Sequence, residues 1–189
     1  MGGYMTYRLA SELSDRIAAV ASVAGPVIQP ILDSCLNTPP IAVLHIHGTA
    51  DSSIPYNGTP GDYPHVDTLV NYFIAKNNCP VQADTTVFPD INTLDNCTVT
   101  KYHYGFCDDS TEVVFYKVFN GGHSWPGGLF AIPGLGNMNL DIKASAEIWN
   151  FFKRHELKPC AFNAVNEFQV SGFRFQVYPN PSNGMFNVQ

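Results

Sequence analysis

The sequence lacks any apolar run long enough to cross a bilayer, which predicts no membrane insertion. It is also poor in charge: charged residues make up 14% of the 189 residues, and Lys and Arg form no cluster. With a net charge of -6, this pattern argues against a nucleic-acid partner. Few charges combined with many glycines, prolines and aromatic residues favour a secreted protein over a cytosolic one.

The chain also lacks any Cys-x-x-Cys pair, which argues against a structural zinc site. Neither a metal nor another cofactor is expected. The chain has five cysteines, and an odd number leaves one thiol over. Three of them, within Cys79 to Cys107, lie in one irregular region, and we expect at least one disulfide there because disulfides are the natural state of a secreted chain.

Two strand patterns each end close to a polar residue with catalytic potential. Ile41 to Ile46 is a nearly unbroken apolar run, typical of a strand buried on both faces, and Asp51 follows it. The β-branched and aromatic run Val113 to Phe119 predicts another strand, which two glycines separate from His123. Ligands bind beyond the carboxyl ends of the strands in an open parallel sheet, so Asp51 and His123 are expected at that edge.

An aspartate followed along the chain by a histidine is the second half of the order Ser…Asp…His found in α/β-hydrolases. The first half is a serine in the elbow Gly-x-Ser-x-Gly. If Met1 is the residue after this serine, Gly2 is the last glycine of the elbow. We therefore expect the nucleophile just before Met1, and the backbone nitrogen of Met1 as one donor of the oxyanion hole.

Helical and strand patterns alternate along the remaining chain, which predicts the α/β class with a parallel sheet that lacks its first strands. We expect a helix with Met5, Leu9 and Leu13 on its buried face, and a last helix with Trp149 and Phe152 in the core. The other expected elements are a strand at 17–23, a helix at 66–74, a short strand at 99–104 and a loop at 125–139.

A set of short motifs follows in a recognisable order. They are Gly2-Gly3-Tyr4-Met5, Ala21-Ser22-Val23-Ala24-Gly25, His45-Ile46-His47-Gly48-Thr49-Ala50-Asp51, Gly122-His123-Ser124-Trp125-Pro126-Gly127 and Ile148-Trp149. Together they resemble the polyhydroxybutyrate depolymerase and feruloyl/acetylxylan esterase family of α/β-hydrolases. The resemblance covers roughly residues 2 to 155. It implies that Asp51 is the triad acid, that His123 is the triad base and that the substrate is an ester.

The end of the chain carries a second resemblance. Tyr178-Pro179-Asn180-Pro181-Ser182-Asn183-Gly184 looks like the beginning of the carboxyl-terminal sorting domain of type IX secretion in Bacteroidetes. It implies a partner in the secretion machinery and a secreted or cell-surface location. The expected organisation is a truncated hydrolase domain at 1–157, a linker at 158–171 and the start of a β-rich sorting domain at 172–189.

Plainer interpretations stand beside these assignments. His123 and Asp51 could be ordinary turn residues, but the flanking glycines and the resemblance favour catalysis. Tyr56 and Trp125 are candidate pocket residues, for which ordinary aromatic packing is at least as good an interpretation. Ser124 is discounted as a nucleophile because neighbouring side chains rarely point at each other productively.

A metal-dependent hydrolase using His45, His47, Asp51 and His123 is a further alternative. His45 and His47 alternate along a strand and therefore point to one face. However, Thr49 stands where the binuclear pattern His-x-His-x-Asp-His needs its aspartate. We expect His45 to be a packed strand residue and His47 to border the site without acting.

The leading hypothesis is a secreted serine-type carboxylic ester hydrolase acting on a polymeric or plant cell-wall ester. Because its serine lies upstream of Met1, the 189-residue chain by itself is expected to be inactive. The alternative is a non-catalytic secreted binding module on a degenerate hydrolase scaffold.

Overall fold

Strand β2 (Ala42–Gly48) is the centre of the fold, and every one of its residues is buried. A computed structural model describes residues 1–35 and 38–157 of the chain. The helices are α1 (Gly2–Glu12), α2 (Gln29–Cys35), α3 (Val66–Lys76), the 3-10 helix η1 (Asp108–Ser110) and α4 (Ala144–Phe152). The other strands are β1 (Ala19–Val23), β3 (Asp84–Val87), β4 (Thr98–Tyr104) and β5 (Val113–Phe119).

The strands form one mixed sheet in the order β1-β2-β5-β4-β3. β1, β2 and β5 are parallel to one another, which agrees with the expected α/β class. β4 is antiparallel to β5, and β3 is antiparallel to β4, so the sheet is mixed and the expected parallel arrangement holds only for β1, β2 and β5. The reason is the short connection at 105–112, because a parallel crossover needs a dozen or more residues whereas an antiparallel neighbour does not.

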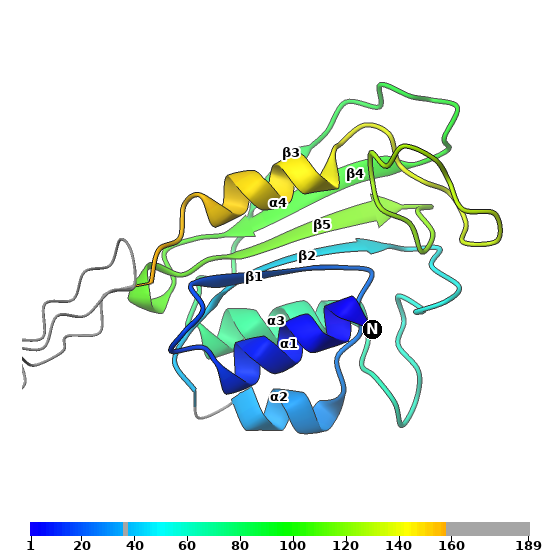
Figure 1. The fold of residues 1–189 in the computed structure, drawn as a ribbon. Helices are drawn as coiled ribbons and strands as arrows, with labels where there is room; N and C mark the ends of the chain where they lie inside the picture. The colour runs from blue at the N-terminus through cyan, green and yellow to red at the C-terminus, as the bar shows by residue number, and fades with distance from the viewer. Residues whose placement is uncertain (36–37, 158–189) are drawn as a thin grey trace, which may run out of the picture. The chain divides into compact units, whose positions relative to one another are not determined.

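Helices cover both faces of the sheet: α1, α2 and α3 lie on one face, and α4 lies on the other (Figure 1). Alternate residues of the central strands therefore enter two apolar clusters. On the α3 side, Val43 and Phe115 pack with Phe73, and on the α4 side, Leu44 and Tyr116 pack with Phe151. This two-sided burial accounts for the unbroken apolar run that marks β2 in the sequence.

Two helices bury a different face from the one their apolar residues indicated. In α1, Met5 is half exposed, and Tyr7, Ala10 and Ser11 are the buried residues. In α4, Trp149 is 63% exposed, and Phe151 takes the core position expected of it. Phe152, also expected in the core, is partly buried against the α4-side cluster.

The expected disulfide is present and joins Cys79, just after α3, to Cys107, just after β4. Cys35 and Cys97 are buried free thiols, and Cys160 lies outside the described residues. The linker at 158–171 and the sorting domain at 172–189 also lie outside them, so both stay predictions. No helix in the described part of the chain is long and apolar enough to cross a membrane.

Candidate functional site

The carboxyl ends of β2 and β5 meet because these strands are parallel neighbours, with Gly48 paired to Val118. The loops beyond them are joined by backbone hydrogen bonds. Thr49 N–H donates to Val118 O at 2.9 Å, and Ala50 N–H donates to Gly121 O at 2.9 Å. The pairing therefore brings the segments that carry Asp51 and His123 side by side.

Glycines make this close approach possible. A Cβ atom on Gly48 would lie 2.2 Å from Gly121 O, and one on Gly122 would lie 2.2 Å from Leu135 O. Neither position can hold a side chain unless backbone moves. The next residue, His123, donates its own N–H to Leu135 O at 2.6 Å, so the 125–139 loop fixes the backbone that carries the imidazole.

Asp51 and His123, the two predicted catalytic residues, are in contact. His123 Nδ1 lies 2.8 Å from Asp51 Oδ2, across a separation of 72 residues in the chain. The Asp51 side chain is fully buried, whereas the His123 side chain is 33% exposed. A carboxylate only accepts, which assigns the proton to Nδ1 and leaves Nε2 of His123 as a basic nitrogen.

The second oxygen of Asp51 is held by the loop that follows it. Oδ1 accepts the N–H groups of Ser53 at 2.9 Å and of Ile54 at 2.8 Å. Both carboxylate oxygens thus have partners, as a charged group removed from water requires. Asp51 therefore holds the His123 ring through Nδ1 and leaves Nε2 available to accept a proton, which is the geometry that general-base catalysis needs.

His45 and His47 lie behind this pair on one face of β2, with both side chains buried and their rings stacked at 5.2 Å between centroids. His45 is a packed strand histidine, as expected. His47 Nε2 approaches Asp51 Oδ2 to 3.6 Å and donates to Ile54 O at 2.9 Å. Within the described residues, no group of three or more His, Cys, Asp or Glu side chains is arranged to hold a metal ion, so this geometry does not support the metal-dependent alternative.

The remaining predicted residues have varied surroundings. Tyr56 is buried, its ring meets His47 edge-on, and its hydroxyl donates to Asp67. Trp125 is 47% exposed, and its indole N–H donates to Ser145 Oγ at 3.1 Å. Met1 is fully exposed and precedes α1. Their assigned roles in the oxyanion hole and the pocket stay predictions.

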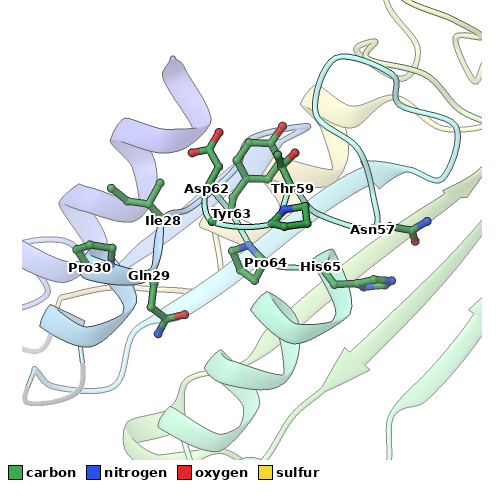
Figure 2. A pocket seen from close by; sticks show the side chains of 11 residues that line it. Ile28, Gln29, Pro30, Asn57, Thr59, Asp62, Tyr63, Pro64 and His65 are labelled. Carbon is green, nitrogen blue, oxygen red and sulfur yellow. The ribbon is translucent and has the colours of Figure 1, made fainter.

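A hollow of about 610 Å³ opens beside the segment that follows Tyr56 (Figure 2). Its described lining comes from residues 28–30, 57 and 59–65, and it includes the rings of Tyr63 and His65. None of Asp51, His123, Tyr56 and Trp125 is among these lining residues. The sequence did not indicate this hollow, since a loop rich in Gly, Pro and Asn carries no sign of its shape.

Comparison with known proteins finds similarity to esterases. The chain is 30% identical over 125 residues to the bifunctional acetylxylan esterase/xylanase XynS20E of Neocallimastix patriciarum. The aligned region covers 66% of this chain and 17% of that protein. It is 34% identical over 142 residues to "Putative esterase NocK" of Nocardia uniformis subsp. tsuyamanensis. This alignment covers 68% of this chain and 41% of that protein.

The chain therefore spans less than half the length of either of these relatives. No family model matches it. The esterase part of the resemblance found in the sequence agrees with both relatives. Their names mention neither a polyhydroxybutyrate depolymerase nor a sorting domain, so those parts of the resemblance stay predictions.

Proposed function

We propose that this protein is a serine-type carboxylic ester hydrolase of the α/β-hydrolase fold. In this proposal His123 is the general base and Asp51 orients it. The single observation that carries the proposal is the 2.8 Å contact between His123 Nδ1 and Asp51 Oδ2 at the carboxyl edge of the parallel strands. Similarity to two proteins named as esterases supports the reaction class.

The chemistry follows from this pair. Nε2 of His123 takes the proton of a serine hydroxyl while the serine oxygen attacks the ester carbonyl, and Asp51 stabilises the imidazolium that forms. The imidazolium then gives the proton to the departing alcohol, which leaves an acyl-serine. Water, deprotonated by the same nitrogen, attacks the acyl carbonyl and releases the carboxylic acid and the free serine.

The nucleophile is the group that the described residues do not provide. No serine hydroxyl among them hydrogen-bonds to His123 Nε2, and the Oγ of Ser124 donates to Asn137 O at 2.9 Å. We propose that the serine directly precedes Met1 and that the Met1 N–H contributes to the oxyanion hole. In support, α1 begins at the same edge of the sheet at which β2 and β5 end (Figure 1).

The close packing of the start of α1 also supports this place for the nucleophile. A Cβ atom on Gly3 would lie 2.4 Å from the Cα atom of Gly25, in the loop just beyond β1. A tight helix start against a strand end is what a nucleophile elbow needs, because the turn must expose its side chain at the top of the sheet.

A secreted or cell-surface location and a polymeric or plant cell-wall ester are the finer parts of the proposal. The Cys79–Cys107 disulfide supports export, because disulfides persist in oxidising compartments. Recovery of the protein from the cytoplasm with both thiols reduced would contradict that part.

The experiment compares two proteins on para-nitrophenyl acetate: the 189-residue chain, and the same chain preceded by the residues encoded directly before Met1. The longer protein is expected to hydrolyse the ester, and its Asp51→Asn variant is expected to lose about 10,000-fold in kcat because Asn favours the wrong tautomer. The shorter chain is expected to be no faster than its own His123→Ala variant. A longer protein without hydrolysis would favour the non-catalytic binding module.

A further inference from the structure

Three polar rings are buried in an otherwise apolar cluster behind the proposed site. Tyr7 of α1 is 0% exposed, and His45 and His47 of β2 are each 1% exposed. Around them pack Val43, Phe73 and Phe115. Burial of polar groups is costly unless each one is hydrogen-bonded, so the pairing of these rings has to be accounted for.

The rings form a hydrogen-bonded series with one possible direction. Ile54 O can only accept, so the contact at 2.9 Å assigns a proton to Nε2 of His47. Nδ1 of His47 must then accept from Nε2–H of His45 at 3.1 Å. Nδ1 of His45 must in turn accept from the hydroxyl of Tyr7 at 2.5 Å. Every proton position in the series therefore follows from the carbonyl at its end.

Burial keeps all three rings uncharged near neutral pH. Desolvation lowers the pKa of His45 well below its usual value, and the neighbouring His47 lowers it further. Desolvation also lowers the pKa of His47, although the bond to Ile54 and the charge of Asp51 oppose it. Burial raises the pKa of Tyr7. The rings therefore act through directed hydrogen bonds and not as charges.

The series ends on the residue that holds Asp51. The carbonyl oxygen of Ile54 accepts a hydrogen bond from His47 Nε2–H, and the Ile54 N–H donates to Asp51 Oδ1 at 2.8 Å. His47 Nε2 is 3.6 Å from Asp51 Oδ2, too far for a hydrogen bond. His47 thus reaches Asp51 through Ile54, by fixing the turn that presents the carboxylate to His123.

We propose that His47 is a positioning residue for the Asp51–His123 pair, and that the Tyr7–His45 contact sets the tautomer in which His47 can do this. The part of this inference that concerns catalysis rests on the proposed function. The structural claim is independent of catalysis: a directed chain of hydrogen bonds connects α1 to the loop that carries Asp51 and Ile54.

The test reads the tautomers directly, on the 15N-labelled 189-residue chain, through correlations from ring carbon-bound protons to ring nitrogens at a pH where the rings are neutral. In the wild-type chain we expect His47 as the Nε2–H tautomer and His123 as the Nδ1–H tautomer. His47→Leu removes the donor to Ile54, and we expect His123 to populate both tautomers. His47→Gln retains an amide donor near the Nε2 position, and we expect it to restore the wild-type pattern of His123.

Tyr7→Phe tests the far end of the series, with Tyr72→Phe as its matched control. The Tyr72 hydroxyl also makes a 2.5 Å bond, but to Leu32 O and not to a ring of the series. Its ring packs against the same apolar cluster. We expect Tyr7→Phe to shift the ring nitrogens of His45 and His47, and Tyr72→Phe to leave them unchanged. Equal effects of the two variants would overturn the role of Tyr7.

Two other results would overturn the role of His47: an unchanged His123 tautomer in His47→Leu, or the same change in His47→Gln as in His47→Leu. In a protein that hydrolyses esters, His47→Leu should lower kcat about 10- to 100-fold with KM unchanged, because the acid is misplaced while the substrate site is not. The nitrogen shifts need no catalysis. Absence of hydrolysis would therefore defeat the proposed function alone, and unaltered shifts would defeat this inference alone.

Discussion

Gly48 and Gly121 lie so close that a Cβ atom on Gly48 would sit 2.2 Å from Gly121 O. Gly48 is the last residue of β2, and Gly121 lies just beyond the end of β5, the parallel neighbour of β2. Their contact sets the separation of the loops that carry Asp51 and His123. The Ala50 N–H bond to the same Gly121 oxygen depends on this approach.

Gly48→Ala should therefore push the two loops apart. Because the obstacle is backbone, we expect a loss of about 1–3 kcal/mol in the free energy of unfolding. We also expect mixed tautomers of His123, since its bond to Asp51 lengthens. Gly105→Ala is the control, because a Cβ atom there would be 3.4 Å from a His103 side-chain atom. Chemical denaturation and ring-nitrogen shifts check both variants, and an undisturbed Gly48→Ala chain would contradict the account.

Glu112 gives the fold a specific acid sensitivity at the opposite end of β5. Its Oε1 accepts from Arg154 Nη2 at 2.6 Å and from His155 Nε2 at 2.8 Å, and His103 Nε2 lies 2.5 Å from Oε2. Burial by itself raises the pKa of Glu112. The hydrogen bonds from His155 and Arg154 and the nearby charges outweigh burial and lower the pKa to about 2.

The folded-state pKa of Glu112 is thus below its unfolded value of about 4.3, so its stabilisation is complete above about pH 4.3 and is lost as pH falls towards 2. The contribution of Glu112 to the free energy of unfolding is on the order of 2 to 3 kcal/mol. Glu112→Gln should lower stability at pH 5 and flatten its pH dependence between those limits. Glu12→Gln, at an exposed pair with Arg8, should keep the wild-type curve. Parallel unfolding curves for Glu112→Gln and wild type would refute the prediction.

The Cys79–Cys107 disulfide should make a large contribution to stability, because it closes a loop with a sequence separation of 28. Chain entropy predicts about 3 to 4 kcal/mol for such a loop. A Cys79→Ser/Cys107→Ser chain should unfold at lower denaturant than wild type, and a reductant should lower the midpoint of the wild type but not that of this double variant. The Cys97→Ser variant, at a free thiol, should still respond to the reductant. Insensitivity of the wild type would contradict the prediction.

For the proposed esterase, we predict that the hollow lined by Tyr63 binds the part of an ester substrate beyond the scissile group. An aromatic face lost from a binding hollow costs about 1 kcal/mol, which corresponds to a rise of about fivefold in KM. In a hydrolytically active protein, Tyr63→Ala should show this rise with bulky esters and none with para-nitrophenyl acetate. Phe106→Ala, at an exposed ring outside the hollow, is the control. Equal KM values for Tyr63→Ala and Phe106→Ala would argue against this role.

The central strands and the position of Asp51 and His123 at one edge of the sheet could be predicted from the sequence because their signals are local. β2, β5 and α3 have strong apolar patterns, and parallel strands bring their carboxyl ends to one edge whatever their neighbours are. By contrast, β3 is exposed throughout Asp84–Val87 and shows no alternation to detect. The helix α2 is missing from the expected elements, because Pro30 stands in its first turn, where proline is tolerated but gives no helical signal.

The mistaken face of α1 has a tertiary cause. Tyr7 is buried because His45, 38 residues later, accepts its hydroxyl bond, and no local pattern shows that partner. Met5 was assigned to the buried face because it is spaced four residues from Leu9, which in turn is four residues from Leu13. The link from His47 through Ile54 to Asp51 likewise depends on the shape of a loop, which residue types by themselves do not determine.

The most direct measurement is kcat/KM for para-nitrophenyl acetate in the protein preceded by the residues encoded before Met1, with His123→Ala set against Ser124→Ala. The two residues are neighbours on one loop, and only His123 contacts Asp51. We predict a loss of about 1,000-fold or more for His123→Ala and near wild-type activity for Ser124→Ala. Full activity in His123→Ala would contradict the assignment of this histidine as the catalytic base.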